Sequence, residues 1–416
     1  MRNSQSILWN QCAFLERIIM NKIKQILELS KEHRDYTAKV LSEIVKIPSL
    51  SAQEQNVINK IKGLLVEAGI ENFWIDHLGS LIAEVGNGPK KLAFDAHIDT
   101  VDTGDMSQWD FDPYCGEITA NEVLGRGSVD QKGGAASMIA AAKILNDMGY
   151  DGEYTIYFAF TVMEEDCDGM CWLNLIEREK LRPDFAVLTE PTDCKVTRGH
   201  RGRMELDIEF SGISSHGSMP HLGDNAIYRA SKAILEIEKL NEKLKEDDFL
   251  GKGTIVVSHI DSKGPSMCAV PDYARIHIDR RLTAGETEET VMAELIKAVD
   301  KKAKISVPEY RKKGYRGNNY PQKMYFPTWK TPIGHPLVKA GISAHKEIFG
   351  HEEKVGKWIF STNGVAISGV HDIPCIGFGP GDEKMAHAPN EKIPIDDLVD
   401  ASAFYAILPY ILEGEK

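Results

Sequence analysis

Short apolar runs alternate with segments of helical periodicity between residues 35 and 190, and this alternation limits the fold more than any other feature. The apolar runs occupy residues 81–85, 92–96, 154–162 and 185–189. Apolar residues recur at helical spacing over 35–68, with a break at 47–49, and an Ala- and Met-rich stretch at 133–148 predicts a buried helix. Strands that alternate with helices form βαβ units, so we expect an α/β fold with a mostly parallel sheet and helices on both faces.

The pattern changes near residue 198. Residues 203–210 alternate polar and apolar side chains, as a strand with one wet face does. A helix, two strands and a second helix are then predicted at 226–244, 254–260, 274–279 and 288–301. The order β-α-β-β-α predicts a small α+β domain with an antiparallel sheet. The sequence then again predicts a helix at 337–349, a buried strand at 375–378 and a final helix at 396–412. We therefore predict an α/β domain made of 1–197 and 312–416, interrupted by an inserted α+β lid domain at 198–311.

The charge balance excludes several classes of protein. The chain has 62 Asp and Glu against 49 Lys and Arg, a net charge of −13, and no long basic run. Nucleic acid and anionic membranes are therefore not expected partners. No apolar stretch reaches the ~18 residues of a membrane span, and residues 1–19 lack a secretory signal. The seven cysteines are scattered and odd in number, which suits reduced thiols. We expect a cytoplasmic protein, with 1–19 as a dispensable tail or an incorrectly assigned start.

Titratable residues follow the ends of the predicted strands, where ligands bind in open α/β sheets. Those at a strand end or in an adjoining loop are His97, Asp130, Glu165, Glu190 and His387. Each signal is weak alone, because a His-x-Asp sequence arises by chance and a Glu-Glu pair is usually a solvated turn. Their shared placement at strand ends favours one common site.

We predict that these five residues bind two divalent cations. Two neutral imidazoles and three carboxylates together carry a charge of −3. Two divalent cations with one bridging hydroxide carry +3, so the whole cluster can be neutral. Mixed nitrogen and oxygen ligands favour Zn²⁺, with Co²⁺ or Mn²⁺ as alternatives, over Mg²⁺ or Ca²⁺. Asp130, a short carboxylate on a glycine-hinged loop, is predicted to bridge the ions. His97 and Glu190 would complete one ion, and Glu165 and His387 the other.

Two further acids beside this cluster have predicted roles. Asp99 lies two positions from His97, and alternate side chains of an extended segment share a face. Its carboxylate can therefore accept from the ring N–H and orient the imidazole. Glu164 diverges from its neighbour Glu165, which leaves it free to take a proton from water and pass it to a leaving amine.

Four segments together resemble the M20 metallopeptidases: 97–101 (HIDTV), 125–134 (GRGSVDQKGG), 164–165 (EE) and 190–192 (EPT). That family includes the succinyl-diaminopimelate desuccinylases, acetylornithine deacetylases, aminoacylases and glutamate carboxypeptidases. Within it, the chain resembles the group labelled selenium-metabolism-linked hydrolases. The resemblance runs from about residue 35 to the C-terminus. It implies the same five metal ligands, with Glu164 as general base and Asp99 as orienting acid.

The resemblance also implies roles for the inserted domain. This lid would join two subunits in a homodimer through its sheet and helices, and His216 would reach the partner subunit's active site and donate to the developing oxyanion. Asn225 and Arg281 match positions that hold the substrate carboxylate. From the residues alone, His216 could be an ordinary loop histidine and Asn225 a helix N-cap. Arg281 could equally pair with Asp279 or Glu286.

One position departs from the family pattern. Many relatives carry Gly-Thr-Asp where this chain has Ser361-Thr362-Asn363-Gly364. That Asp is not a metal ligand in the family, so the metal chemistry should survive the change. Substrate positioning near the loop is expected to differ, because an amide is neutral and can donate as well as accept.

The sequence therefore predicts a two-metal hydrolase of a small molecule, cleaving a peptide or N-acyl amide bond next to a free carboxylate. Hydrolysis of an N-carbamoyl or another C–N bond by the same metals is the alternative. Phosphate esters fit less well, because phosphoryl transfer needs more cationic groups than the sequence places here. A non-catalytic dimeric binding protein is a third possibility, but its expected signature, loss of metal ligands, is not found in the sequence.

Overall fold

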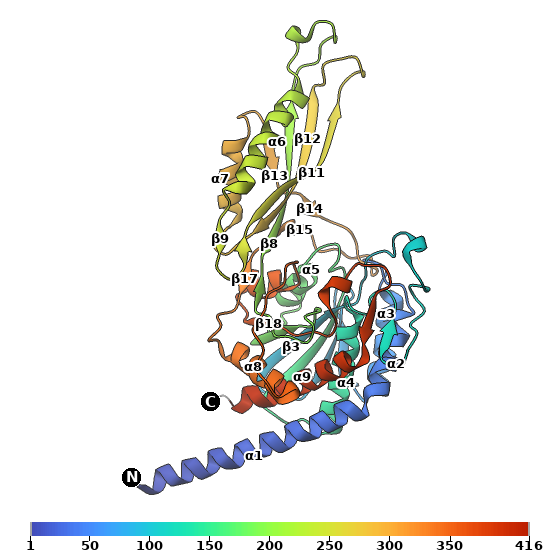
Figure 1. The fold of residues 1–416 in the computed structure, drawn as a ribbon, viewed down its shortest axis with the longest axis vertical. Coiled ribbons are helices and arrows are strands. Elements are labelled where there is room, and N and C mark those ends of the chain that lie inside the picture. The colour runs from blue at the N-terminus through green and yellow to red at the C-terminus, as the bar shows by residue number, and fades with distance from the viewer. Residues whose placement is uncertain (1, 415–416) are drawn as a thin grey trace.

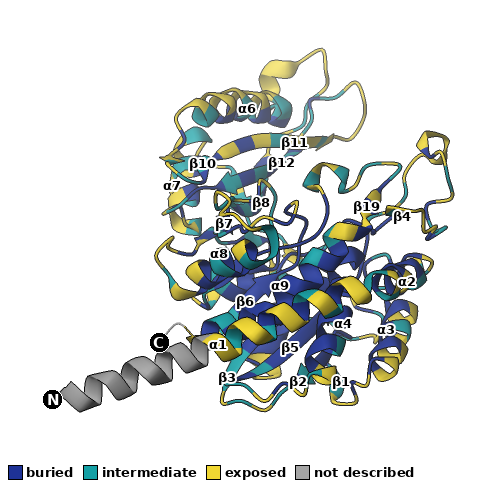
Figure 2. Ribbon diagram, turned by 60° about the horizontal axis from the view of Figure 1, so that its bottom comes forward, coloured by how far each residue is buried: buried dark blue, intermediate teal, exposed yellow. Residues whose placement is uncertain are grey.

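The computed structural model describes residues 2–414, with side chains from Arg17 onward. It has two parts, a helix-covered α/β domain and an elongated lid that rises from it (Figure 1). Helix α1 (Arg2–Glu32) contacts α9 and α4 through its described side chains, with Ile23 and Ile26 buried (Figure 2). Most side chains of 1–19 lie outside the described residues, so the dispensable tail stays a prediction.

The α/β domain is built on a mixed sheet with the strand order β1-β2-β5-β3-β6-β18. Strands β5, β3, β6 and β18 run parallel, while β1 and β2 form an antiparallel edge. The strands are β1 (Phe73–Ile75), β2 (Leu81–Val85), β3 (Lys90–His97), β5 (Tyr154–Thr161), β6 (Phe185–Leu188) and β18 (Cys375–Gly377). The predicted α/β fold is confirmed, and the antiparallel edge is an addition that the apolar runs do not reveal.

Helices cover both faces of this sheet. The larger core lies on one face, where Phe94 of β3 packs beneath helices α2 (Arg34–Val45), α3 (Gln55–Glu67), α4 (Lys132–Asp147) and α9 (Ile395–Gly414). Ala93 points to the opposite face of the sheet, where it belongs to a smaller core. The helix α5 (Met170–Leu173) and π-helical turns at 174–178 and 365–370 cover this core. Helix α8 (Pro336–Phe349) contacts β18 and α9. Because both faces of the sheet are covered, the side chains on both sides of each strand are buried, and this explains why the strand sequences are apolar throughout.

The lid is an antiparallel sheet with helices on one face. Its strands follow the order β11-β12-β8-β13, and β16 also pairs with β8. The lid elements are β8 (Gly202–Ser211), α6 (Ala226–Glu242), β11 (Thr254–Lys263), β12 (Tyr273–Leu282), α7 (Glu288–Ala298), β13 (Lys304–Ser306) and β16 (Tyr325–Phe326). Burial alternates along β8, as the polar–apolar alternation predicts. Because β16 belongs to the lid sheet, that sheet continues past residue 311, and the domain limits stay a prediction.

Short strand pairs join distant parts of the chain. Where the two connections enter and leave the lid, β7 (Gly199–His200) pairs with β17 (Trp329–Lys330). Strands β4 (Glu122–Leu124) and β19 (Lys392–Pro394) pair with each other next to α2 and α9. The others are β9 (Glu246–Asp247) with β10 (Gly251–Lys252), and β14 (Glu309–Tyr310) with β15 (Gln322–Lys323). Within residues 2–414, no helix combines the length and apolar character needed to cross a membrane.

The stacked pair of Phe404 in α9 and Phe378 after β18 gives a stability prediction. Their ring centroids lie 3.7 Å apart at an interplanar angle of 3°, and both side chains are fully buried. We expect Phe404→Ala to lower the free energy of unfolding by about 3–5 kcal/mol, because it leaves a cavity against the sheet. Denaturant unfolding measures this. Val66→Ala, on the exposed side of α3, should stay within about 0.5 kcal/mol of the parent, and equal effects of the two changes would contradict this packing.

Candidate functional site

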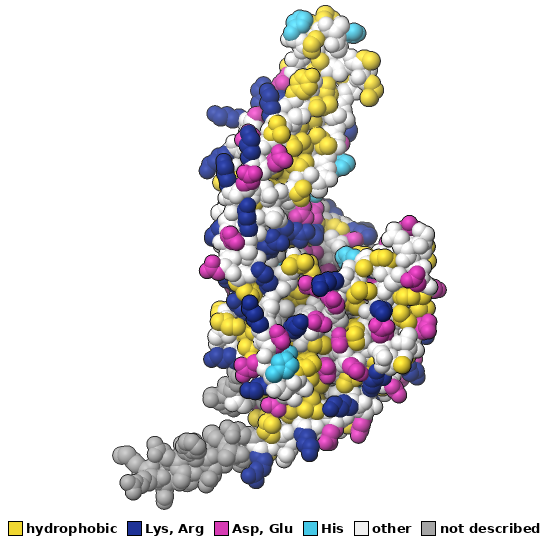
Figure 3. All heavy atoms as spheres, viewed as in Figure 1, with side chains coloured by type: hydrophobic (Ala, Val, Ile, Leu, Met, Phe, Trp, Pro, Cys, Tyr) yellow, Lys and Arg dark blue, Asp and Glu magenta, His cyan; other side chains and the backbone are white. Residues whose placement is uncertain are grey.

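All five predicted metal ligands line one cavity of about 320 Å³ between the α/β domain and the lid. Figure 3 shows the hollow at this junction, bordered by acidic and basic side chains. The ends of parallel strands explain the convergence: His97 ends β3, Glu165 follows β5 and Glu190 follows β6. These strands are neighbours in the sheet, so their carboxyl ends meet at one edge. Asp130 precedes α4, and His387 precedes β19.

The five side chains form two groups that share Asp130. His97 Nε2 lies 3.0 Å from Asp130 Oδ1 and 3.6 Å from Glu190 Oε1. His387 Nε2 lies 3.2 Å from Asp130 Oδ2 and 3.1 Å from Glu165 Oε2. In each group one ligand atom per residue lies within 4.8 Å of the others, close enough to hold a metal ion. Asp130 thus presents a different oxygen to each group.

The donor set fits cations better than it fits protons alone. Glu164 Oε1 and Glu165 Oε1 are buried, and neither has a hydrogen-bond partner among the described residues. Burial raises the pKa of Glu190 well above its usual range, and burial next to Asp130 raises the pKa of Glu165 to about 7. Hydrogen bonds to Asp130 and Glu165 raise the pKa of His387 to about 10. Without cations these groups retain protons, and divalent ions would replace those protons.

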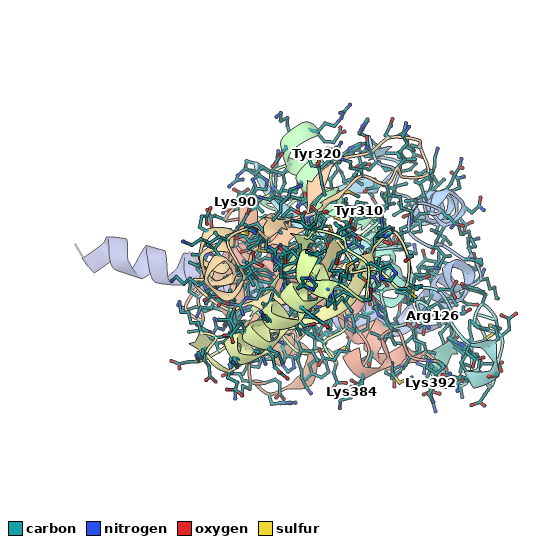
Figure 4. The ribbon with its side chains drawn as sticks, turned by 90° about the horizontal axis from the view of Figure 1, so that it is seen from above. Lys90, Arg126, Tyr310, Tyr320, Lys384 and Lys392 are labelled. Carbon is teal, nitrogen blue, oxygen red and sulfur yellow. The ribbon has the colours of Figure 1, made fainter. Side chains whose placement is uncertain are left out.

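Glu391 and Arg126 hold the two loops that carry Asp130 and His387. The carboxylate of Glu391 accepts hydrogen bonds of 2.8–3.0 Å from N–H groups within 127–130 and one of 2.7 Å from Arg126 Nη1. Arg126, labelled in Figure 4, also donates to the backbone carbonyls of Ala388 (3.1 Å) and His387 (3.4 Å). Sequence reasoning missed both residues, because only the pairing of β4 with β19 brings them together.

Asp99 contacts His97 through its backbone carbonyl and, at a longer distance, through the predicted carboxylate. His97 Nδ1 lies 3.0 Å from the backbone carbonyl oxygen of Asp99 and 3.5 Å from its Oδ1. The carboxylate also accepts from Ser51 Oγ at 2.6 Å and from the backbone N–H groups of Glu164 and Glu165 at 3.2 and 3.1 Å. The carbonyl is therefore the nearer acceptor for the imidazole, and the carboxylate fixes the turn that carries both glutamates.

Glu164 faces the cavity and belongs to neither group of three. Its Oε2 lies 3.8 Å from His97 Nε2, and the residue is 6% exposed. Burial raises the pKa of Glu164 well above its usual range. A buried carboxyl with a free oxygen beside the ligands can exchange a proton with a molecule in the cavity.

The lid residues divide into one that reaches this cavity and two that do not. Arg281 lines it, and its Nε and Nη2 also donate to Asp279 at 2.8 and 3.2 Å. His216 is exposed, with Nδ1 2.7 Å from Ser218 Oγ. It belongs to the loop before α6, and that loop lies at the end of the lid away from the α/β domain (Figure 1). Asn225 caps α6, accepting from the backbone N–H of Ile227 at 2.9 Å. Within one chain, His216 and Asn225 therefore lie outside the cavity.

Asn363 is fully buried behind the cavity wall. Its Nδ2 donates to Asp95 Oδ2 at 2.9 Å, and its Oδ1 accepts from the backbone N–H of Gly169 at 2.8 Å. Phe360 and Ser361 line the cavity, but Asn363 does not. An amide N–H group at residue 363 can donate to the carboxylate of Asp95, which a carboxylate at this position could not do. The departure from the family pattern thus affects packing behind the site.

Comparison with known proteins identifies the family. The model of peptidase family M20/M25/M40 matches residues 93–409. This chain belongs to the M20 family. YgeY of Escherichia coli K12, named an uncharacterized protein, is 48% identical to this M20 chain over 389 residues, covering 93% of this chain and 96% of YgeY. A "Probable succinyl-diaminopimelate desuccinylase" of Staphylococcus epidermidis is 27% identical, covering 85% of this chain and 92% of its own length.

Solved structures agree with the fold. The M20 family metallo-carboxypeptidase Sso-CP2 of Sulfolobus solfataricus superimposes with a TM-score of 0.71 at 20% identity, covering 91% of this chain and 99% of that one. The family match makes this chain an M20 metallohydrolase that acts on peptide or amide bonds. The resemblance that the sequence motifs indicate is confirmed.

The cavity of this M20 chain contains residues that sequence reasoning missed. They are Asp168, Arg203, Phe360, Ser361, Glu383 and Ala386. Arg203 lies opposite Arg281 in the neighbouring strand, so an alignment of the two lid strands could have found it. Asp168 follows Glu165 closely in the chain, but nothing in its sequence context marks it as buried.

Asn363→Asp should destabilise the protein. A second carboxyl would face Asp95, whose pKa burial already raises, so we expect the free energy of unfolding to fall by about 2–3 kcal/mol. One of two buried carboxyls keeps its proton on folding, so the loss should be larger at pH 8 than at pH 5. Denaturant unfolding at both pH values measures it. Asn146→Asp, at an exposed amide, is the control, and an equally small effect of both changes would contradict the Asp95 contact.

Proposed function

We propose that this chain is a two-metal amide hydrolase that cleaves a peptide or N-acyl bond next to a free carboxylate. The observation that carries the proposal is the sharing of Asp130 by two potential ligand groups, through different oxygens. His97, Asp130 and Glu190 would hold one ion, and Asp130, Glu165 and His387 the other. Nitrogen and oxygen donors together favour Zn²⁺, with Co²⁺ or Mn²⁺ as alternatives.

The chemistry needs a proton carrier beside the cations. Two bound divalent ions would polarise the scissile carbonyl and acidify water. Glu164 takes the proton of the attacking water and delivers it to the leaving amine. Its position supports this role, because its carboxylate faces the cavity beside His97, and one of its oxygens has no hydrogen-bond partner among the described residues. Asp99 holds the turn that keeps Glu164 in place.

Arginine side chains support a substrate that carries a carboxylate. Arg281 and Arg203 are neighbours across β12 and β8, and both line the cavity. A guanidinium presents paired donors that suit a carboxylate. Sso-CP2 is named a metallo-carboxypeptidase and the Staphylococcus epidermidis relative a "Probable succinyl-diaminopimelate desuccinylase", and both names support a substrate that carries a carboxylate. The same cavity would also accept an N-carbamoyl amino acid, which is the alternative substrate.

A homodimer formed through the lid would complete the site. Strand β11 is an edge of the lid sheet, and Val256 and Ile260 on it are about half exposed. Tyr228 and Leu235 of α6 are also exposed, and Figure 3 shows an apolar strip along the lid. An apolar surface beside an open strand edge favours pairing with a second copy. His216 and Asn225, at the far end of the lid, would then reach the partner subunit's cavity.

The remaining features are consistent with a cytoplasmic enzyme. The described cysteines are free, which suits a reducing compartment. A non-catalytic binding protein is disfavoured, because all five ligands and Glu164 are present and converge on one cavity. Phosphate ester hydrolysis is disfavoured, because phosphoryl transfer needs more cationic groups than this site offers. Among the described residues that line the cavity, Arg203 and Arg281 are the Lys or Arg side chains.

A substrate panel tests the proposal. It contains dipeptides, N-acyl amino acids, N-carbamoyl amino acids and phosphate esters, each assayed with added Zn²⁺ or Co²⁺. We expect hydrolysis of an amide member that carries a free carboxylate, and loss of activity after chelation. Activity on phosphate esters alone, or no activity on any member with metal supplied, would contradict the proposal.

Glu164→Gln should separate metal binding from turnover. We expect both ions to remain, because Glu164 is not a ligand, while kcat falls by about 10²–10⁴-fold through loss of proton transfer. Metal content by mass spectrometry and steady-state kinetics measure the two effects. Glu236→Gln on the exposed surface of α6 should change neither. Turnover within a few-fold of the parent would remove Glu164 from its proposed role.

Mixed dimers test the action of His216 across subunits. His216→Ala should lower kcat more than it raises KM, because it removes a donor to the developing oxyanion. When His216→Ala and Glu164→Gln chains are mixed, hybrid dimers contain one site with both residues intact, so part of the activity should return. Absence of rescue in dimers shown to exchange subunits would mean that His216 does not act in the partner's site.

A further inference from the structure

One loop of the lid crosses onto the α/β domain next to the site. The chain leaves the lid sheet after β13 and returns to it at β16, and both of these strands pair with β8. The residues between them, 307–324, include β14 and β15 and form a loop that we call the strap (Figure 1). Both ends of the strap are therefore fixed to the lid sheet.

The middle of the strap is bonded to the α/β domain. Tyr315 Oη donates to the backbone carbonyl of Gly79 at 2.9 Å. Arg316 Nη1 donates to the backbone carbonyl of Asp76 at 2.6 Å. Both carbonyls belong to the turn between β1 and β2. The strap therefore connects the lid sheet to the antiparallel edge of the α/β sheet.

At its beginning the strap contacts the turn that carries the two glutamates of the site. Asp166 Oδ2 accepts from Tyr310 Oη, labelled in Figure 4, and from Lys312 Nζ, each at 2.7 Å. In the chain, Asp166 directly follows Glu164 and Glu165. Its carboxylate is about one-third exposed, and Asp166 is not among the described residues that line the cavity. The strap thus reaches the glutamates through a residue that has no direct place in the site.

Buried carboxylates of the α/β domain hold the first half of the same turn. Asp99 accepts from the backbone N–H groups of both glutamates. Glu54 Oε1 accepts from the backbone N–H of Met163 at 3.1 Å, and Glu54 is fully buried. The strap adds a restraint on the other side of the glutamates, at Asp166. A turn that carries a metal ligand needs such supporting contacts to keep the ligand in place.

We propose that Tyr310 and Lys312 are positioning residues that act through Asp166. They hold the turn so that Glu165 meets its metal ion and Glu164 faces the attacking water. Coupling between two binding events is reciprocal, so binding of that ion also holds the strap against the α/β domain. The inference rests on the proposed function, in which Glu165 is a ligand and Glu164 carries the proton.

Two tyrosine variants separate this role from attachment of the strap in general. Tyr310→Phe and Tyr315→Phe each remove one phenolic hydrogen bond to the α/β domain, the first to Asp166 and the second to Gly79. Zinc titration against a competing chelator measures the affinity for each ion. Tyr310→Phe should weaken one of the two Zn²⁺ affinities by roughly three- to tenfold and leave the other unchanged. Tyr315→Phe should change neither, and equal zinc affinities in the two variants would overturn the positioning role.

Steady-state kinetics with Zn²⁺ in excess give a second readout. Lys312→Met should lower kcat by roughly three- to tenfold and leave KM within about twofold, because it acts on the proton carrier and not on the groups that bind substrate. Lys312→Arg keeps a cationic donor for Asp166 and should recover most of the lost kcat. Lys313→Met, at the exposed neighbouring lysine, should change neither constant. Equal losses of kcat in Lys312→Met and Lys313→Met would contradict the role of the Asp166 contact.

Amide hydrogen exchange of the unmodified protein tests the reciprocal coupling without any variant. Saturation with Zn²⁺ should slow exchange in the strap by about threefold or more, while exchange in the lid helix α6, the reference, stays the same. Two bound zinc ions with no change in the strap, or with equal slowing in α6, would overturn the coupling and leave the proposed function intact. If the protein binds no zinc and hydrolyses no amide, the proposed function itself fails, and this inference fails with it.

Discussion

Asp130 lies between two imidazoles and two glutamates in a buried cavity, and the rest of the site depends on how that concentration of negative charge is neutralised. Its two oxygens face His97 and His387 on opposite sides. Burial, with a further contribution from the charge of Asp130, raises the pKa values of Glu165 and Glu190. Protons can neutralise the cluster, but only divalent cations can do so while leaving both histidines neutral and the carboxylates ionised.

The scaffold supplies this geometry by two different means. Parallel strands deliver His97, Glu165 and Glu190 to one edge of the sheet. Asp130 and His387 come from loops, and loops need restraint to hold a ligand geometry. Glu391 and Arg126 provide that restraint through backbone hydrogen bonds to both loops. The sheet therefore fixes the position of three of the predicted ligands, and side-chain contacts from Glu391 and Arg126 fix the loops that carry the other two.

The sequence predicts the features that depend on local periodicity or on strand ends. The apolar runs identify the main strands and helices, and strand ends with their adjoining loops identify five of the residues that line the cavity. Features set by contacts between distant segments escape this reasoning. The antiparallel edge formed by β1 and β2, the addition of β16 to the lid, and the Glu391 clamp all depend on pairing that no local pattern reveals.

Atomic choices within a correctly chosen residue also escape the sequence. Spacing places Asp99 beside His97, but only the folded backbone puts its carbonyl closer than its carboxylate to the imidazole. In the same way, the sequence does not show that Asp168 Oδ2 and Arg203 Nε are buried without a hydrogen-bond partner among the described residues. Which atom is free depends on packing around the side chain, and packing is a property of the whole fold.

Anomalous diffraction at the zinc absorption edge, from crystals of the zinc-loaded enzyme, tests the central claim most directly. The account predicts two strong peaks roughly 3.5–4 Å apart, one on each side of the Asp130 carboxylate. One peak would be bounded by His97 and Glu190, and the other by Glu165 and His387. A single peak, or zinc bound away from Asp130, would contradict it.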